Sequence, residues 1–394
     1  MPEPGPSRAA SPHIGGLDSL RGIAALLVAF HHVWLLGALR PDNVWVWRLL
    51  RYSPLRMILE GRPPVILFFV LSGFVLAHAL LRRPTSYRDF AIRRFARIYP
   101  PFAVAILVSA AGYALLDPVA RPFSGWFGTL WQGGYRLPAV LGHLLMAGDG
   151  RDGLDPVVWS LVHELRLSLL MPLLLWAGRR NWLALLAGSL VLQWLVVPFG
   201  IDAGTDAACR AWLSCRPYWG SSWGGSLLVS GYFIAFFVLG IGIAVHRARL
   251  GALVRRLPAW ATLVTLVVAV SLLSGLPVAD DLAFGAGAGL LILLVLEARG
   301  FSRVLALPPL TGLGRISYSL YLIHLPVFLV VIYGLPAVPA GLRVALLVPL
   351  SLLAAWLFHR AVEAPAQAFG RLLTAPRNRP AQSSEARPRA SARA

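Results

Sequence analysis

The chain alternates long apolar stretches with short polar loops over most of its length. About ten of these stretches approach the roughly 20 residues that a transmembrane helix needs. The pattern therefore predicts an all-α fold, a polytopic membrane helix bundle of about ten transmembrane helices. Residues 138–147 are also apolar, but they are too few to span a bilayer and predict a re-entrant or surface helix. The predicted spans are 17–39, 64–81, 100–116, 157–177, 182–198, 227–246, 258–276, 282–296, 316–333 and 342–362.

Composition agrees with a membrane protein. Of the 394 residues, 57% are hydrophobic and 13% are charged, whereas a soluble domain is about 45–50% apolar and about 25% charged. Mean hydropathy is +0.68. These values exclude a soluble globular enzyme, a disordered protein and a coiled coil.

The net charge of +19 comes from 36 basic and 17 acidic residues, and the basic residues are all arginine. A basic chain often binds nucleic acid, but these arginines gather in short loops between apolar stretches, where they set topology. We therefore expect membrane lipids and no nucleic acid as partners. The arginine-rich loops alternate, which predicts a multi-pass protein of the inner (cell) membrane with both termini in the cytoplasm. Loop 40–62 departs from this bias, because it places five arginines on the predicted outer side.

The chain divides into three parts. Residues 1–16 are polar and Pro-rich and predict a cytoplasmic tail without a cleavable signal. Residues 17–365 form the predicted transmembrane domain, and the Arg-rich segment 366–394 predicts a disordered cytoplasmic tail. Cys209 and Cys215 lie in a predicted outer loop, where they either form a disulfide or remain two thiols.

Ionisable side chains inside a span are costly and indicate a functional site. Arg21 and His32 lie in the first span, and at about 100° per residue they share one face of the helix. The helical rise puts His32 about 16 Å deeper than Arg21, near the middle of the bilayer. His31 is rotated about 100° away and should face a neighbouring helix. The alternatives are a snorkelling Arg21 and a structural histidine bonded to a backbone carbonyl.

Glu164 approaches the same depth from the opposite side of the membrane, about 10 Å below its surface. A carboxylate there must be paired or protonated. Its possible partners are His163 and Arg166 on its own helix and His32 on another. The alternative is a purely structural ion pair with Arg166 or Arg21.

Two further pairs share a helix face. Tyr321 and His324 lie three residues apart before Pro326, which breaks the helix, and they predict a polar lining at mid-depth or a helix-packing face. Arg94 and Arg97 lie three apart at the start of the third span, where two guanidiniums suit a phosphorylated ligand. Spacing alone favours the alternative that these arginines only set topology.

Spacing therefore predicts a polar cavity near the midplane, with a histidine inside it and arginines at its inner mouth. Such a cavity suits either a transmembrane transfer reaction or a non-enzymatic transporter or exporter of a polar solute. No internal repeat of the transporter kind is visible in the sequence.

Six motifs occur in order along nearly the whole chain. They are 16–25 (GLDSLRGIAA) followed by His31-His32, 68–74 (FFVLSGF), 94–100 (RFARIYP), Trp159-Ser160-Leu161 with Glu164, 314–324 (GRISYSLYLIH) and 362–365 (VEAP). Together they resemble the acyltransferase-3 family of integral-membrane O-acyltransferases. The chain departs from the family at Leu167 and Ser168, where many members carry an aromatic pair, and this leaves the acceptor open.

The resemblance implies transfer of an acyl group, often acetyl, from cytoplasmic acyl-CoA to a hydroxyl of an envelope carbohydrate, a lipid-linked glycan or another acceptor. It implies no metal. It makes His32 the catalytic histidine with Arg21 as its companion, and it adds Glu164 to the catalytic set. By the same resemblance, Arg94 and Arg97 bind the phosphates of coenzyme A.

This chemistry fits the residues. A hydroxyl that attacks a thioester needs a base matched to neutral pH, which imidazole supplies. The oxyanion that forms needs a hydrogen-bond donor, for which Arg21, Tyr321 and His324 are the candidates. Whether His32 takes the proton or is itself acylated stays open.

Overall fold

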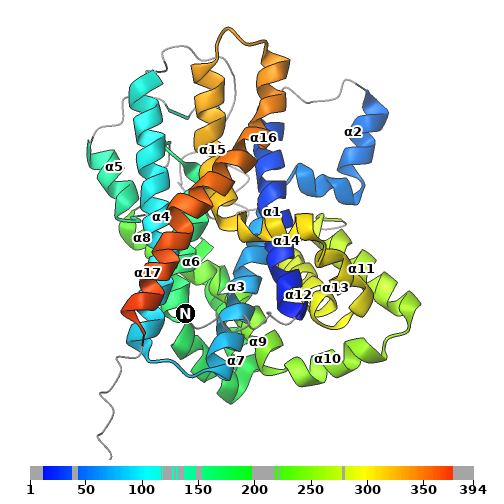
Figure 1. The fold of residues 1–394 in the computed structure, drawn as a ribbon. Coiled ribbons are helices and arrows are strands. Elements are labelled where there is room, and N and C mark those ends of the chain that lie inside the picture. The colour runs from blue at the N-terminus through cyan, green and yellow to red at the C-terminus, as the bar shows by residue number, and fades with distance from the viewer. Residues whose placement is uncertain are drawn as a thin grey trace, which may run out of the picture.

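The computed structural model describes residues 12–37, 43–116, 118, 127, 130–131, 137–147, 153–197, 218–220, 222–276 and 280–375. Every regular element within these ranges is a helix, so the predicted all-α helix bundle is confirmed (Figure 1). The longer helices are α1 (Pro12–Leu35), α3 (Arg62–Arg82), α4 (Tyr87–Leu116), α7 (Met171–Val196), α12 (Asp281–Glu297), α15 (Ser317–Gly334) and α16 (Ala340–Phe358).

Shorter helices connect or extend them. They are α2 (Val44–Arg51), α5 (Leu137–Leu144), α6 (Trp159–Leu169), α8 (Trp223–Tyr232), α9 (Ile234–Val245), α10 (Arg247–Arg256), α11 (Ala259–Leu273), α13 (Arg299–Leu305), α14 (Pro308–Arg315) and α17 (Ala364–Leu373). Two 3₁₀ turns, η1 (Pro54–Ile58) and η3 (Pro156–Val158), and a π-helical turn, η6 (His359–Glu363), complete the described elements.

Each of the ten predicted apolar stretches is helical over most of its length. By length and composition alone, five helices of the described chain can cross a membrane, or six if the pair 156–169 and 171–196, bent by 63°, counts as one span. Helix α1 is not among them, because Asp18, Arg21 and two histidines make it less apolar. The membrane helix bundle is thus confirmed, whereas the count of about ten crossings stays a prediction.

Glycines allow two close helix contacts at the centre of the bundle. A Cβ on Gly73 of α3 would lie 2.3 Å from the carbonyl oxygen of Phe237 in α9, and a Cβ on Gly22 of α1 would lie 2.6 Å from the backbone nitrogen of Gly314 in α14. Small residues at such crossings let helix backbones approach closely in a membrane. Helix α1 is central, because it also packs against α3, α12 and α15.

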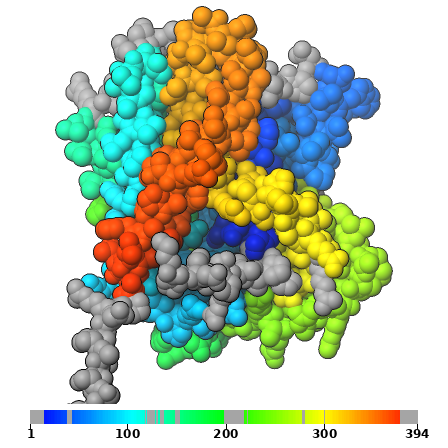
Figure 2. All heavy atoms as spheres, viewed as in Figure 1, coloured from blue at the N-terminus to red at the C-terminus, as the bar shows by residue number. Residues whose placement is uncertain are grey.

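Helical structure extends beyond both predicted boundaries of the membrane domain, which themselves stay a prediction. Helix α1 begins at Pro12, inside the segment 1–16 that was expected to be a tail. Helix α17 continues past residue 365 to Leu373 and lies along α4 (Figure 2), where the Nε of Arg93 donates to the hydroxyl of Thr374 at 2.6 Å. Segments 1–11 and 376–394, as well as Cys209 and Cys215, lie outside the described residues.

The arginines that break the predicted charge bias have local explanations. Arg62 is buried and its Nε donates to both carboxylate oxygens of Asp281, at 3.0 and 2.9 Å. Arg56 pairs with Glu60 at 3.1 Å. Helix α2 has no buried residue and exposes Trp45 beside Arg48, a composition typical of a helix that lies in the membrane interface. Much of the positive charge of loop 40–62 is therefore neutralised or interfacial.

The Arg62–Asp281 pair joins α3 to α12 and should be the costliest single ion pair to break. Asp281→Asn leaves the Arg62 charge buried without its counter-charge, and we expect a loss of about 3–5 kcal/mol of stability. Thermal unfolding of the purified protein in detergent measures this loss. Glu60→Gln breaks the half-exposed Arg56 pair and should cost at most about 1 kcal/mol. Equal losses in the two variants would contradict a structural role for the buried pair.

Candidate active site

Three cavities that the described residues form lie along the bundle, and the first combines an apolar lining with five arginines. This arginine cavity is formed by Arg82 and Arg83 at the end of α3 and by Arg93, Arg94 and Arg97 of α4. The segment before residue 100 was expected to be largely a loop, but α4 already begins at Tyr87. Arg94 and Arg97 are therefore on one helix and line one cavity, as their spacing predicts.

The arginines of this cavity differ in what else they contact. The Nη2 of Arg94 forms an ion pair with Glu164, and its Nε donates to Ser168 at 2.9 Å. Arg93 donates to Thr374. Arg97 has no ion-pair or hydrogen-bond partner among the described residues. The geometry therefore leaves Arg97 available to a bound anion, whereas the charge of Arg94 is already compensated.

The second cavity, the glutamate cavity, lies deeper. Its polar lining includes Arg21, Arg97, Glu164, Tyr318 and Tyr321, and Arg97 also lines the arginine cavity. The Nη1 of Arg21 lies 3.3 Å from Asp18. Two positive charges and one carboxylate thus face a narrow space whose remaining walls, including Phe68 and Phe69, are mainly apolar.

Glu164 has partners other than those considered from the sequence. Its Oε1 accepts from the hydroxyl of Ser72 at 2.8 Å and pairs with Arg94. His163 and Arg166 contact α8 instead: the Nδ1 of His163 lies 2.9 Å from Ser230, and Arg166 also donates to that hydroxyl. The carboxylate therefore joins α6 to α3 and α4.

The third cavity, the histidine cavity, contains both histidines of α1. Its lining includes His31, His32, Glu60, Arg62 and Tyr218. Trp159, Trp219 and Tyr321 add three aromatic rings. The cavity therefore combines aromatic surfaces with several hydrogen-bonding groups, whereas Glu164 does not line it.

Hydrogen bonds fix the tautomers of two histidines in contact. The Nδ1 of His324 lies 3.0 Å from the carbonyl oxygen of Leu320, and the Nδ1 of His32 lies 2.9 Å from that of Val28. A carbonyl oxygen only accepts, so we assign a proton to Nδ1 of each ring. The Nε2 of His324 then accepts from the Nδ1 of His32 at 3.1 Å. This assignment puts the basic lone pair of His32 on Nε2.

His31 and His324 differ from what the sequence indicates. His31 was expected to face a neighbouring helix, but its Nδ1 lies 2.9 Å from the carbonyl oxygen of Leu59, which follows the 3₁₀ turn η1, and the ring lines the histidine cavity. His324 is fully buried and lines none of the three cavities. It is therefore placed to orient His32 rather than to meet a substrate.

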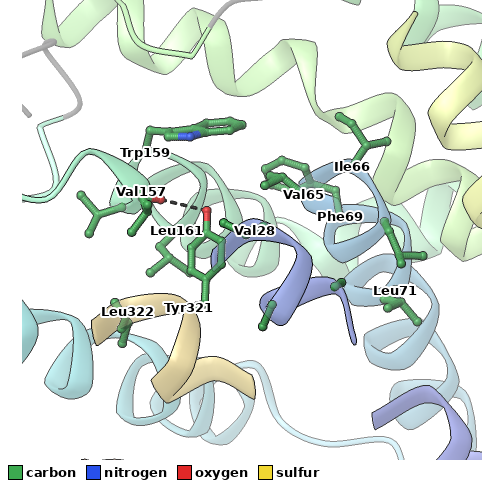
Figure 3. Close-up of a cluster of buried hydrophobic side chains, with 14 of the residues drawn as sticks. Val28, Val65, Ile66, Phe69, Leu71, Val157, Trp159, Leu161, Tyr321 and Leu322 are labelled. Carbon is green, nitrogen blue, oxygen red and sulfur yellow. Dashed lines mark hydrogen bonds between the residues drawn. The ribbon is translucent and has the colours of Figure 1, made fainter. Parts of the chain in front are cut away.

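Tyr321 separates the glutamate and histidine cavities and lines both, together with Val65. Its hydroxyl donates to the carbonyl oxygen of Val157 at 2.9 Å and accepts from Ser160 at 2.7 Å. Figure 3 shows the tyrosine reaching from α15 toward Val157. Tyr321 is thus a polar group in an otherwise apolar partition.

The three cavities follow one another along α3. His78 lines the arginine cavity, Ser72 the glutamate cavity and Arg62 the histidine cavity. At 1.5 Å per residue this succession covers about 24 Å, most of a roughly 30 Å hydrocarbon layer. The cavities therefore lie in series across the bundle.

Helix α1 lines the same cavities in the reverse chain direction, with Leu17, then Arg21, then His32. Arg21 and His32 therefore share a face, as their spacing predicts, but they line successive cavities and no hydrogen bond joins them. The expected single cavity is thus three cavities in series.

Sequence reasoning missed several groups that complete the site. Ser72 and Tyr318 lie within two of the six motifs, and that membership was the signal available in the sequence. The structure places both in the lining of the glutamate cavity, with Glu164 and Arg97. Arg62 was counted only as a loop charge, because nothing in the sequence pairs it with Asp281. Glu363 of the last motif is buried and accepts from Ser319 of α15 at 2.6 Å, so it holds the helix that carries Tyr321.

Comparison with known proteins agrees with the motifs. The chain matches the acyltransferase domain family over residues 14–360. Protein 2 in the picA locus of Rhizobium radiobacter is 33% identical over 110 residues, which cover 27% of this chain and 49% of that protein. Nodulation protein 10 of Rhizobium leguminosarum bv. viciae is 31% identical over 201 residues, which cover 48% of this chain and 51% of that protein.

The chain therefore spans about half the length of these two curated relatives. No solved structure matches it. The family match, in contrast, covers nearly the whole described bundle, including all three cavities. With its apolar helices and its six motifs in order, the chain belongs to the acyltransferase-3 family.

Proposed function

We propose that the protein transfers an acyl group, in the simplest case acetyl, from acyl-CoA on the arginine side to a hydroxyl of an envelope carbohydrate on the histidine side. The observation that carries this proposal is the series of three cavities, which share Arg97 at one junction and Tyr321 with Val65 at the other. A donor and an acceptor on opposite sides of a membrane need such a passage to meet.

The arginine cavity suits the nucleotide part of coenzyme A. Arg82, Arg83 and Arg97 present guanidiniums that form charge-assisted hydrogen bonds with phosphate oxygens. The narrow glutamate cavity, with Phe68 and Phe69 in its wall, suits the slender chain that carries the thioester. We therefore assign phosphate binding mainly to Arg97, and we assign to Arg94 the task of compensating Glu164.

The histidine cavity suits a polyhydroxylated acceptor. Aromatic rings pack against the apolar faces of a sugar, and a few polar groups orient its hydroxyls. Trp159, Trp219 and Tyr218 supply rings, while Glu60 and His31 supply polar groups. A free sugar and a lipid-linked glycan present the same hydroxyl chemistry to these groups.

The reaction starts when Nε2 of His32 takes the proton of the acceptor hydroxyl as its oxygen attacks the thioester carbon. The oxyanion at the former carbonyl oxygen needs a donor, and Tyr321, at the junction where donor and acceptor would meet, supplies one when its hydroxyl turns from the carbonyl oxygen of Val157 to the oxyanion. The carbon–sulfur bond then breaks, and His32 returns its proton to the leaving thiolate. His324 holds His32 in the tautomer that these reaction steps require.

Glu164 takes a different part from the catalytic one expected from the sequence. Its contacts are Ser72 and Arg94, and it lies in a different cavity from His32. We propose that it holds Arg94 and α4 in place beside the thioester arm. It is a positioning residue in this scheme.

The orientation that this scheme requires is testable by itself. We expect both termini and the segment 83–86 in the cytoplasm, because arginines concentrate in and beside them. We expect the segment 335–339, between α15 and α16, on the outside. Reporters that are active on one side only, inserted into each segment, measure this. An outside signal from 83–86 would reverse the direction of transfer.

His32→Ala should lower acyl transfer by about 10²–10⁴-fold, the usual contribution of a general base. His31→Ala should cost much less, because the Nδ1 of His31 contacts the carbonyl oxygen of Leu59, whereas His32 is the ring that contacts His324. The measurement is transfer of label from acyl-CoA to envelope acceptor, in membranes that contain equal amounts of each variant.

His324→Ala should also lower the rate, whereas His324→Gln should retain more activity, because its amide oxygen can accept from Nδ1 of His32. Full activity of His32→Ala, or equal losses in the two α1 variants, would remove His32 from the mechanism. Transport of a polar solute would then be the better explanation of the cavities.

Arg97→Ala should raise the donor KM by about tenfold or more, because one charge-assisted phosphate contact is worth about 1.5–3 kcal/mol. Arg94→Ala should mainly lower the thermal stability, since it leaves Glu164 without its counter-charge. Arg88→Ala, on the same helix but outside the cavities, is the matched control. An unchanged donor KM in Arg97→Ala would argue against the arginine cavity as the coenzyme A site.

A further inference from the structure

A fourth hollow lies apart from the three cavities, between α7, α9, α10 and α12. This lateral groove has an apolar wall that includes Leu239, Ile243, Leu290 and Leu293. Leu183 and Leu253 flank it with 68% and 61% of their surface exposed. Exposed leucines on both sides of an apolar groove are stable where they face lipid chains rather than water. The groove therefore lies on a lipid-facing side of the bundle.

Local backbone features hold the groove open. Helix α7 breaks at Asn181, whose backbone is extended with φ −153°, and a new turn starts there because its side chain accepts from the backbone nitrogen of Ala184 at 3.0 Å. The Nε1 of Trp182 donates to the carbonyl oxygen of Val238 at 2.9 Å, so the ring lies against Gly242. Because α7 breaks at Asn181, the indole of Trp182 points toward α9.

The rim of the groove is positively charged. Arg179, Arg180, His246 and Arg249 line it, and no acidic residue does within the described chain. The guanidinium of Arg180 stacks on Trp176, whereas Arg179 and Arg249 are exposed and have no ion-pair partner among the residues that the structure describes.

The carboxylate of Glu297 already forms ion pairs with other arginines. Glu297 of α12 pairs with Arg247 and Arg255 of α10, so it does not neutralise the rim. Two arginines of the groove therefore remain available to an anion.

The rim lies at the same end of the bundle as the arginine cavity. The Nη1 of Arg247, two residues before Arg249, lies 3.4 Å from Nε2 of His78, which lines that cavity. Figure 1 likewise places α7, α9 and α10 together at one end of the bundle. The charged rim is thus at the level of the lipid headgroups, and the apolar wall lies at the level of the acyl chains.

We propose that the lateral groove binds an anionic phospholipid, whose phosphate is held by Arg179 and Arg249 and whose acyl chain packs along Leu239, Ile243, Leu290 and Leu293. An uncharged lipid would leave the arginines without a counter-charge, and a water-soluble phosphate would leave the apolar wall uncovered. The combination of both surfaces in one groove selects a molecule that has both parts.

The test is a titration of the purified full-length protein in detergent with dioleoyl-phosphatidylglycerol, followed by native mass spectrometry. We expect the affinity to fall about fivefold for each arginine removed, hence about 25-fold in Arg179→Ala/Arg249→Ala. Ala286→Trp should also lower the affinity, because it fills the groove from an exposed position of α12 and leaves both charges in place.

The matched control is Arg256→Ala/Arg303→Ala, which removes two exposed arginines outside the groove and should leave the affinity unchanged. Phosphatidylcholine has acyl chains but no net charge, and glycerol 3-phosphate has a negative charge but no acyl chain, so neither should compete with dioleoyl-phosphatidylglycerol. An equal loss in the control pair, or competition by either of these two molecules, would overturn the proposal. Thermal unfolding of each variant shows that any loss of binding occurs in folded protein.

Discussion

A charged side chain inside a bilayer must find its counter-charge or its hydrogen-bond partner within the protein, and the arrangement of these helices depends on that constraint. Arg62 with Asp281 joins α3 to α12, and Arg94 with Glu164 joins α4 to α6. Both pairs are oriented by hydroxyl groups, from Tyr232 and Ser72 respectively. The polar groups are therefore gathered on one line through the bundle, and the space along this line is the series of cavities.

Backbone carbonyls provide a second constraint, because they only accept hydrogen bonds. The carbonyl oxygens of Val28 and Leu320 each occupy the Nδ1 of a histidine, and this leaves one direction for the bond between His32 and His324. The orientation of His32 is thus set by its own helix and by α15. Because Glu363 in turn holds Ser319 of α15, it supports the centre of the site although it lines none of the three cavities.

The distribution of arginines has more than one physical role in this protein. Arg82, Arg83 and Arg97 line a cavity, Arg62 and Arg94 form buried ion pairs, and the exposed Arg179 and Arg249 line the lateral groove. A count of positive charges per loop treats all of them alike, although a buried pair contributes no net charge to a loop. This explains why loop 40–62 departs from the charge bias that the other loops follow.

The sequence by itself determined the helical class, the shared face of Arg21 and His32, and the shared face of Arg94 and Arg97, because these features depend only on local apolar content and helical periodicity. The motifs, matched one by one, determined the family. Only the tertiary structure decided that Glu164 pairs with Arg94, that His324 orients His32, that Arg62 meets Asp281, and that the expected cavity is three in series. Each of these contacts joins helices far apart in the chain, with partners that are 70, 292 and 219 positions apart. Periodicity along one helix contains no information about which face of another helix packs against it.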